Sequence, residues 1–226
     1  RASGIREIRG NLILDRSIFE DMPYDAPQFD GDPLKPYNAG PDALLLNYKV
    51  FAFHFLPNPA RNQVDITVDP PVATYPVMAP ALTNGACGDW QGKLSPNMGR
   101  ISTNFTGSYS AACGEKTWYL HPYLMNHSEY FGVVFRQLWN DVGGVFNGAV
   151  SNGVVPPAAR FVTEWQSTSL PEVIRDINKY SNNVMARQLL LTLAADVLKL
   201  PASPERGARV VKTWMANKGI DTTQVV

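Results

Sequence analysis

Ser181 and Asn183 stand two positions apart and carry a hydroxyl and an amide that could act together on a substrate. They come directly before an almost wholly apolar stretch, Val184–Leu198. A hydroxyl and an amide held at the start of a rigid helix can be offered to the same bound substrate. The same residue types also cap helices, because their side-chain oxygens accept hydrogen bonds from the first free N–H groups. The local pattern therefore leaves two interpretations open, a catalytic pair or a helix cap formed by Ser181 or Asn183.

Three helices are predicted around this pair. Ser169-Leu-Pro-Glu172 has the pattern of a capping box with proline in the first turn, and predicts a helix that ends near Lys179. The apolar stretch after Asn183 predicts a second helix in the middle of a domain, because it is apolar nearly all round. Ser203-Pro204 opens a third helix, for which Gly219 is the C-terminal stop.

The part of the chain before residue 160 is predicted to be mainly strands with one helix. Apolar spacing over Ser128–Gly143 predicts an amphipathic helix capped by Ser128 or Asn126. Alternating and β-favouring residues predict strands, and these lie at Gly4–Asp15, Ala43–Phe55 (with a bend at Asn47-Tyr48-Lys49), Asn62–Val68, Val72–Met78, Arg100–Gly107, Thr117–Leu120 and Val145–Val150.

Composition and charge narrow the class of protein. The 226 residues are 45% hydrophobic and 18% charged, which is a globular composition. Lys plus Arg and Asp plus Glu are equal at 20 each, so no basic footprint for nucleic acid is expected. No apolar run is long enough to span a membrane, and no signal peptide is recognised. Two cysteines and three histidines do not reach the usual zinc spacings, so neither a metal nor a cofactor is expected.

Cys87 and Cys113 are the two cysteines of the chain. Their flanking residues alone do not decide between two buried thiols and a disulfide. Both flanks have the composition of exposed turns, where an unpaired thiol is a liability outside the cytosol. We therefore favour a Cys87–Cys113 disulfide within a β-rich insert.

Three segments carry a resemblance to a known family. Trp165–Leu193 resembles the Ser-x-Asn region of the penicillin-binding proteins of the D-Ala-D-Ala carboxypeptidase/endopeptidase type (low-molecular-mass class C). Tyr37–Lys49 and Gly4–Phe19 resemble the long insertion of the same family. The resemblance thus spans nearly the whole chain, and it places Ser181 and Asn183 in the second of the three motifs of the penicillin-recognising serine enzymes.

The resemblance implies an activity and roles for these residues. In the family, the serine of Ser-x-x-Lys attacks the carbonyl of the penultimate D-Ala, and the acyl-enzyme is then hydrolysed. Carried over, Ser181 relays a proton towards the leaving amine and Asn183 orients the acyl-amide group of the substrate. The implied partners are peptidoglycan stem peptides and β-lactam antibiotics, and the implied location is the bacterial periplasm. Association with further copies of the chain is left open.

The chain departs from the family pattern at the other two motifs. No serine is followed three places later by lysine, and Lys-Thr-Gly does not occur; Lys116-Thr-Trp and Lys212-Thr-Trp are partial matches. We interpret the chain as an internal piece of such an enzyme, inactive on its own. A non-catalytic peptidoglycan-binding or scaffolding module remains the alternative. A class A β-lactamase relative is disfavoured, because those enzymes have a much shorter stretch before Ser-x-Asn.

The expected fold class is α+β, in three parts. Residues 1–70 with 119–162 form an insertion domain of mixed strands and helix, residues 71–118 form a nested β-rich module, and residues 163–226 form the Ser-x-Asn helical part of a serine β-lactamase/transpeptidase-like domain. The proline-rich loop before Tyr37 carries Asp32, which we expect to pair with the free amine of the diamino acid in the stem peptide. A solvated loop acid is the alternative for Asp32.

Overall fold

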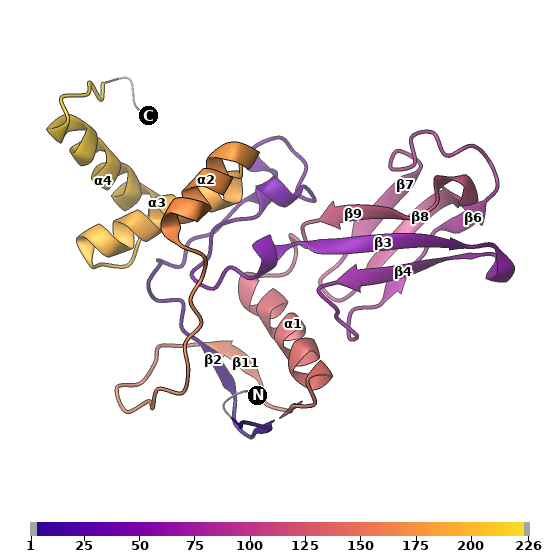
Figure 1. Ribbon diagram of the computed structural model, residues 1–226, viewed down its shortest axis with the longest axis horizontal. Helices are drawn as coiled ribbons and strands as arrows, with labels where there is room; N and C mark the ends of the chain where they lie inside the picture. Colours follow the sequence, from indigo (N-terminus) through magenta and orange to yellow (C-terminus); the bar gives the residue numbers. More distant parts are fainter. Residues whose placement is uncertain (1–3, 224–226) are drawn as a thin grey trace.

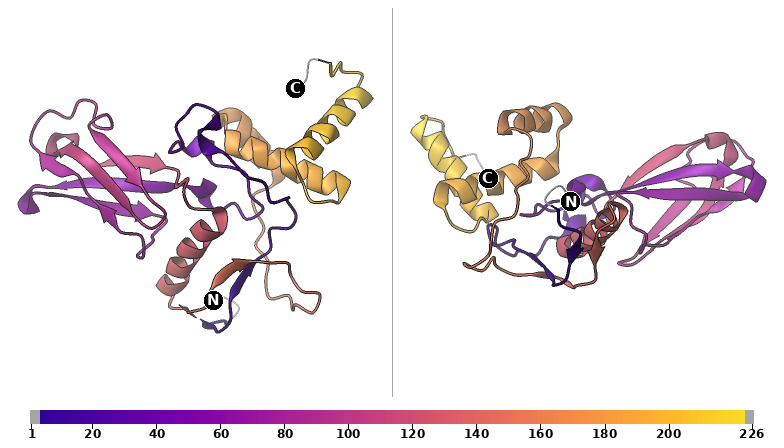
Figure 2. Two further views of the ribbon diagram at one scale, coloured as in Figure 1. Left: turned by 180° about the vertical axis from the view of Figure 1, so that it is seen from behind. Right: turned by 60° about the horizontal axis from the view of Figure 1, so that its bottom comes forward.

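The structure is a computed structural model that describes residues 4–223. It is a mixed α/β arrangement with strands concentrated at one end and helices at the other (Figure 1). Within the described residues, no helix is long and apolar enough to cross a membrane. The views in Figure 2 agree that the strand-rich end projects away from helices α2 to α4, with α1 lying between the two ends.

The strand-rich end consists of two sheets packed face to face. The first has the antiparallel order β4-β3-β9, from Gln63–Asp69, Phe51–Asn58 and Lys116–Leu120. In the second sheet β8 (Thr103–Ser110) pairs with β5, β6 and β7, which are Val77–Met78, Ala81–Thr83 and Leu94–Met98. The strand predicted at Asn62–Val68 from its alternating apolar residues is present as β4, and it pairs with β3 in an antiparallel hairpin.

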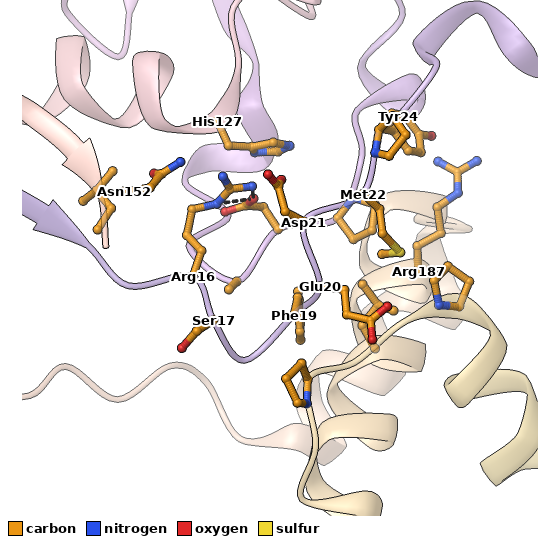
Figure 3. Close-up of a pocket in the computed structure, with 18 of the residues that line it drawn as sticks. Arg16, Ser17, Phe19, Glu20, Asp21, Met22, Tyr24, His127, Asn152 and Arg187 are labelled. Atoms are coloured by element: carbon orange, nitrogen blue, oxygen red, sulfur yellow. Dashed lines mark hydrogen bonds and ion pairs between the residues drawn. The ribbon is translucent and has the colours of Figure 1, made fainter. Parts of the chain in front are cut away.

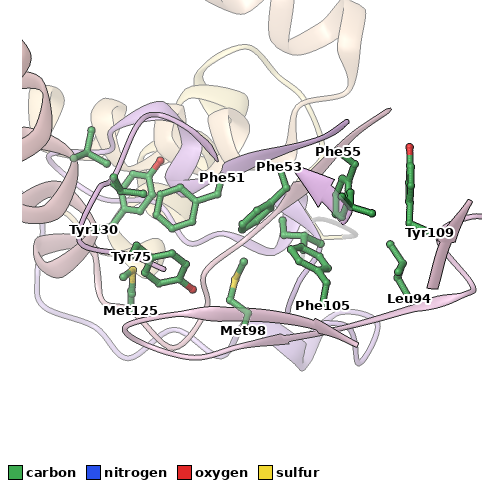
Figure 4. Close-up of a cluster of buried hydrophobic side chains, with 14 of the residues drawn as sticks. Phe51, Phe53, Phe55, Tyr75, Leu94, Met98, Phe105, Tyr109, Met125 and Tyr130 are labelled. Atoms are coloured by element: carbon green, nitrogen blue, oxygen red, sulfur yellow. The ribbon is translucent and has the colours of Figure 1, made fainter. Parts of the chain in front are cut away.

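Alternation along β3 builds the core between the sheets. Phe51, Phe53 and Phe55 are fully buried, because every second side chain of a strand points to the same face. Phe105 of β8 lies edge-on to Phe53 and Phe55, with ring centroids 5.1 and 4.9 Å apart (Figure 4). Such edge-to-face pairs add about 0.5–1.5 kcal/mol each beyond their burial.

A disulfide closes the second sheet at its edge. Cys87, in the loop after β6, is bonded to Cys113 in the turn after β8, with 4.7 Å between their Cα atoms. Cys113 is buried in the same core as the phenylalanines. The bond therefore fixes a long loop onto the end of β8.

Helix α1 (His127–Asp141) joins the sandwich to the rest of the chain. Asn126 caps it, in a reciprocal pair with Glu129, as one of the two predicted caps. Tyr130 and Val134 extend the sandwich core from the helix side. After α1, two short parallel pairs bring the chain back beside its beginning: β1 (Glu7–Ile8) with β10 (Val145–Phe146), and β2 (Leu12–Leu14) with β11 (Val150–Asn152).

The helical end contains α2 (Leu170–Tyr180), α3 (Asn183–Leu198) and α4 (Pro204–Asn217), close to the predicted bounds. Helices α3 and α4 cross closely at Gly207, where a Cβ atom would lie 2.6 Å from Leu190 Cγ. Ser203 caps α4 by accepting a hydrogen bond from Arg206 N–H at 3.3 Å. Glycine at the crossing lets the two helix backbones approach.

Several sequence predictions are wrong in detail. Residues 43–50 form turns rather than a strand, the strand at Val72–Met78 is reduced to its last two residues, and Val145–Val150 is divided between two strands. Helix α3 is not buried all round: only Val184, Leu191, Ala194 and Ala195 are buried. Tertiary contacts, which propensity does not register, decide these positions.

The core of the sandwich is built from residues on both sides of positions 70 and 118. Strands β3, β4 and β9 fall on both sides of the boundaries at residues 70 and 118, yet they share a core with β7 and β8. Residues 154–169, which lead into the helical end, are exposed throughout. One core therefore holds together the residues on either side of positions 71 and 118. The segment before α2, in contrast, is an exposed connection.

Candidate active site

The junction between α2 and α3 presents Ser181 in an unusual backbone conformation. Its φ of 50° and ψ of 46° are left-handed, and it ends α2 with its N–H bonded to Ile177 C=O. A left-handed conformation costs an L-residue about 1–2 kcal/mol, and glycine is the usual residue there. A serine at this position is therefore held by its surroundings rather than by its own preference.

Asn182 is the helix cap, which corrects the expectation that Ser181 or Asn183 caps α3. Its side-chain oxygen accepts a hydrogen bond from Met185 N–H at 3.0 Å. Ser181 and Asn183 are exposed, and neither side chain makes a hydrogen bond to any residue from 4 to 223. The two residues that the motif singles out are thus free of the capping role.

Ser181 and Asn183 line a cavity of about 620 Å³ together with residues from the other end of the molecule. The cavity lies between the junction of α2 and α3 and the start of β3, two parts of the chain that can be followed in Figure 1. Four tyrosines, one acid, two asparagines and four small or apolar residues complete its lining: Pro36, Tyr37, Asn47, Tyr48, Val50, Ala52, Asp69, Tyr119, Tyr180, Asn182 and Val184.

One wall of this cavity is a left-handed turn. Asn47, Tyr48 and Lys49 have φ values of 46°, 52° and 51°. Conformations of this kind cost about 1–3 kcal/mol per residue and concentrate at functional sites. Asn47 holds the turn by donating from Nδ2 to Val50 C=O at 3.1 Å. The bend predicted at these residues is present, and it projects Tyr48 into the cavity lining.

Asp32 lies in the loop that leads into this cavity but is not part of its lining. Its carboxylate accepts a hydrogen bond from Leu34 N–H at 3.1 Å and lies 3.8 Å from Lys35 Nζ. Pro36 and Tyr37, a few positions further on, do line the cavity. The structure thus places the loop, though not Asp32 itself, beside Ser181.

The neighbouring Asp30 organises this loop. It accepts hydrogen bonds from Tyr37 Oη at 2.6 Å and from Asn38 Nδ2 at 2.7 Å. The bond from Tyr37 holds the pKa of Asp30 below its usual value, and the same bond raises the pKa of the Tyr37 phenol. Tyr37 is therefore anchored at its hydroxyl while its ring borders the cavity.

Side chains of helix α3 form hydrogen bonds with the backbone that precedes the left-handed turn. Gln188 Oε1 accepts from Asp42 N–H at 3.0 Å, and Gln188 Nε2 donates to Asp42 C=O at 2.9 Å. Arg187 Nη1 also donates to Tyr37 C=O at 3.2 Å. These contacts join residues about 150 positions apart, so no local sequence pattern indicates them. They fix the start of α3, and with it Ser181 and Asn183, against the loop.

A second, larger cavity of about 1110 Å³ has Asp42 in its lining. In Figure 3 Arg16 and His127 stand at one side of it and Tyr24 and Arg187 at the other. Asp42 is buried and paired with Arg16, whose Nε donates to its carboxylate at 2.8 Å.

Several titratable groups are buried around this ion pair. Burial lowers the pKa of Lys49 to about 8, and lowers that of His127 to about 4 and that of His121 to about 3. His121 Nδ1 lies 3.0 Å from Pro33 C=O, and its Nε2 is buried without a hydrogen-bond partner in the described chain. Within residues 4–223, no group of three His, Cys, Asp or Glu side chains could hold a metal ion.

The chain is similar to proteins of known activity. It is 22% identical over 225 residues to the D-alanyl-D-alanine carboxypeptidase DacB of Haemophilus influenzae. That match covers 97% of this chain and 46% of the relative, so the chain spans about half the length of the curated relative.

Solved structures share the fold. The crystal structure of penicillin binding protein 4 (dacB) from Haemophilus influenzae covers the whole of this chain, with a TM-score of 0.74 at 20% identity, and 49% of its own length is matched. The same protein complexed with a novel β-lactam gives a TM-score of 0.63 at 19% identity, over 97% of this chain and 47% of its own. The family model of the D-Ala-D-Ala carboxypeptidase 3 (S13) family matches residues 1–226. The chain belongs to this family.

Proposed function

We propose that the chain is the part of a serine D-Ala-D-Ala carboxypeptidase/endopeptidase that carries its Ser-x-Asn motif, acting on peptidoglycan stem peptides and taking up penicillin as an acyl-enzyme. The observation that carries this proposal is the placement of Ser181 and Asn183. Their side chains, relieved of capping by Asn182, line one cavity with Tyr37 and three further tyrosines. Family membership supports the reaction class.

The roles follow from the chemistry of acyl transfer. A serine hydroxyl attacks the carbonyl carbon of the penultimate D-Ala, the C–N bond breaks, and the departing amine takes up a proton. We assign that proton delivery to the Ser181 hydroxyl, and we assign the orientation of the scissile amide to the Asn183 side chain, which can both donate and accept. Water then cleaves the acyl-enzyme. The attacking serine and its lysine are assigned to a Ser-x-x-Lys motif outside these 226 residues.

The fold and the location are proposed on the same basis. Residues 1–70 with 119–162 are assigned to an insertion domain, residues 71–118 to a β-rich module within it, and residues 163–226 to a partial transpeptidase-like domain. The Cys87–Cys113 disulfide supports an oxidising compartment, for which the bacterial periplasm is our proposal.

Covalent labelling tests the proposal. The 226-residue chain incubated with penicillin should show no mass adduct, because a serine hydroxyl is a weak nucleophile without a partner that takes its proton. The full-length protein that contains the chain should form a stoichiometric adduct and hydrolyse D-Ala-D-Ala peptides. A full-length protein that forms no adduct would instead be a non-catalytic peptidoglycan-binding module, and an adduct on the isolated chain would overturn the fragment interpretation.

Asp32 is proposed to pair with the free amine of the diamino acid at the rim of the cavity. Its loop continues into Tyr37, and its carboxylate is 44% exposed. In the full-length protein, Asp32→Ala should weaken hydrolysis of stem peptides that carry the amine and spare those in which the amine is acetylated. Equal loss on both substrates would show a folding effect, and Asp30→Ala, which removes the anchor of Tyr37, is the comparison for such an effect.

A further inference from the structure

We infer that the end of the β4-β3-β9 sheet is a saccharide subsite, which binds the glycan attached to the stem peptide, and this rests on the proposed function. The registers of the two strand pairs place Asp69, Ala52 and Tyr119 in one row across the sheet. Residues in such a row point to the same face. All three line the cavity that contains Ser181 and Asn183.

The row leaves a hollow because its middle residue is small. Neighbouring strands lie about 4.8 Å apart, so the backbones at Asp69 and Tyr119 are separated by roughly 10 Å with only the Ala52 methyl between them. Tyr119 is 58% exposed and Tyr48, beside it in the cavity, is 47% exposed. The hollow is therefore bordered by two open phenol rings and by a carboxylate.

Asp69 is the single charged residue of the cavity lining. Its carboxylate makes no hydrogen bond or ion pair with any other residue of the described chain. An anionic group is excluded from such a site by repulsion, since no basic residue lines it. A lone ammonium group would occupy a small part of about 620 Å³ and would leave the tyrosine rings without contact. The occupant has to offer hydrogen-bond donors and an apolar face together.

A pyranose ring has this combination. Its C–H face packs on aromatic rings, and its hydroxyl and amide groups donate to a carboxylate. The next row of the same sheet face is Thr67, His54 and Thr117, with His54 Nδ1 2.9 Å from Thr117 Oγ1. This row continues the surface with polar groups on which a glycan strand can extend.

The distance between the two ends of the substrate is compatible with this site. A peptide spans at most about 3.5 Å per residue, so a saccharide attached a few residues from the scissile bond stays within reach of the cavity that holds Ser181. The sandwich thus contacts the polymer while the helix junction contacts the peptide.

Matched substrates separate this subsite from the catalytic site. In the full-length protein, Tyr119→Ala and Asp69→Asn should each lower kcat/KM about tenfold on a disaccharide pentapeptide, and leave kcat/KM on the sugar-free pentapeptide unchanged. Tyr123→Ala is the matched control, because Tyr123 is also exposed and lies outside the cavity. Equal losses on both substrates, or no loss on either, would overturn the inference. If the two variants instead lose activity on every substrate with a free peptide amine, and on none in which that amine is acetylated, whether or not the sugar is present, the site binds a cation. That result would also overturn the inference.

A binding measurement keeps the inference independent of catalysis. Saturation-transfer NMR with the neutral N-acetylglucosamine disaccharide should show binding to the full-length wild type and to Tyr123→Ala, and loss of binding in Tyr119→Ala. Saccharide binding of this kind by a protein that cleaves neither peptide would contradict the proposed function and uphold the subsite. Peptide cleavage without saccharide binding would do the reverse.

Discussion

Among single residues, the Ser181–Asn183 motif divides two roles: one residue caps the helix, and the other two are left for catalysis in the proposed function. Asn182 supplies the helix cap, while Ser181 is held in a left-handed conformation that its side chain does nothing to stabilise. The backbone and the hydroxyl of Ser181 can therefore be tested independently.

Two substitutions of Ser181 make that test. In the full-length protein, Ser181→Gly should keep or raise the free energy of unfolding, because glycine adopts positive φ without a steric penalty. Both Ser181→Gly and Ser181→Ala should lower turnover by roughly 10²–10⁴-fold, the usual effect of losing a proton-transfer group. The measurements are urea unfolding and kcat on a D-Ala-D-Ala peptide. Turnover near that of the wild type in the glycine variant would reduce Ser181 to a helix end.

The sequence identified the motif but not its neighbours. Ser181 and Asn183 are singled out by the resemblance of their segment to the Ser-x-Asn region of the family, since the local pattern alone leaves a helix cap open. Asn182 was missed as the cap because serine and asparagine all suit that position, and only geometry chooses among three adjacent candidates. Asp69, Tyr119 and Gln188 carried no local signal, since their partners are brought near by strand register and helix docking.

At the scale of elements, α3 shows what periodicity leaves undecided. An apolar helix was expected in a domain interior, yet Val197 is 58% exposed, as is Trp214 of α4 at 57%. The pattern predicted the helix and where it begins, though not the residue that caps it, because apolar content is a local property of the sequence. Which faces are covered depends on the elements that pack against it.

The attachment of α3 to the Asp42 backbone gives a second prediction. Gln188→Glu replaces the donor to Asp42 C=O by a charged oxygen and should cost about 1–3 kcal/mol of unfolding free energy, because a part-buried hydrogen bond is lost and a carboxylate faces the carbonyl, which keeps only its bond from Leu45 N–H at 3.2 Å. Turnover should also fall, since the start of α3 carries Ser181. Thr192→Ala is the control: one turn on, Thr192 Oγ1 bonds only within the helix, to Gln188 C=O. Equal effects of the two substitutions on stability and turnover would contradict the role of the attachment.

The disulfide gives a third prediction, at the edge of the second sheet. Replacing Cys87 and Cys113 together by serine should lower the free energy of unfolding by about 3 kcal/mol, because the bond closes a loop between residues 26 apart. Urea unfolding of the oxidised wild type and the double variant measures the difference. Thiol titration of the denatured, unreduced protein is the check on the bond itself, and two free thiols would rule it out.

At the scale of the whole molecule, buried titratable groups lie where the sandwich meets the helical end. Burial holds the pKa of His127 at about 4 and that of His121 at about 3, below the value of about 6.5 in the unfolded chain. Below pH 6.5 the unfolded state therefore binds more protons than the folded state. Stability should fall as the pH drops from about 6.5 towards 4.

Urea midpoints at pH 7 and pH 5 measure this dependence. His127→Gln should reduce the loss of stability between the two values, because one of the two imidazoles whose pKa is lowered by desolvation is gone. His54→Gln, on the sheet face, is the control and should keep the loss of the wild type. A His127→Gln variant with an unchanged loss would show that other groups govern the acid sensitivity.

The exposed connection before α2 gives a prediction about the division of the chain. Residues 154–169 are exposed and contain Arg160, so trypsin should cut there before it cuts the sandwich. Mass spectrometry of brief digests should find fragments that end at Arg160. Early cleavage inside residues 51–120 would contradict the single packed core described for the sandwich.

The capping bond of Asn182 has a consequence for how the motif tolerates change. The middle letter of Ser-x-Asn is not a free position, because initiation of α3 depends on it. A saturation library at residue 182 should rank by capping preference, with Asn, Asp, Ser and Thr above Ala, Val and Leu. Libraries at residues 181 and 183 should rank by catalysis instead. Residues 181 and 183 would then be constrained by catalysis, and residue 182 between them by helix capping.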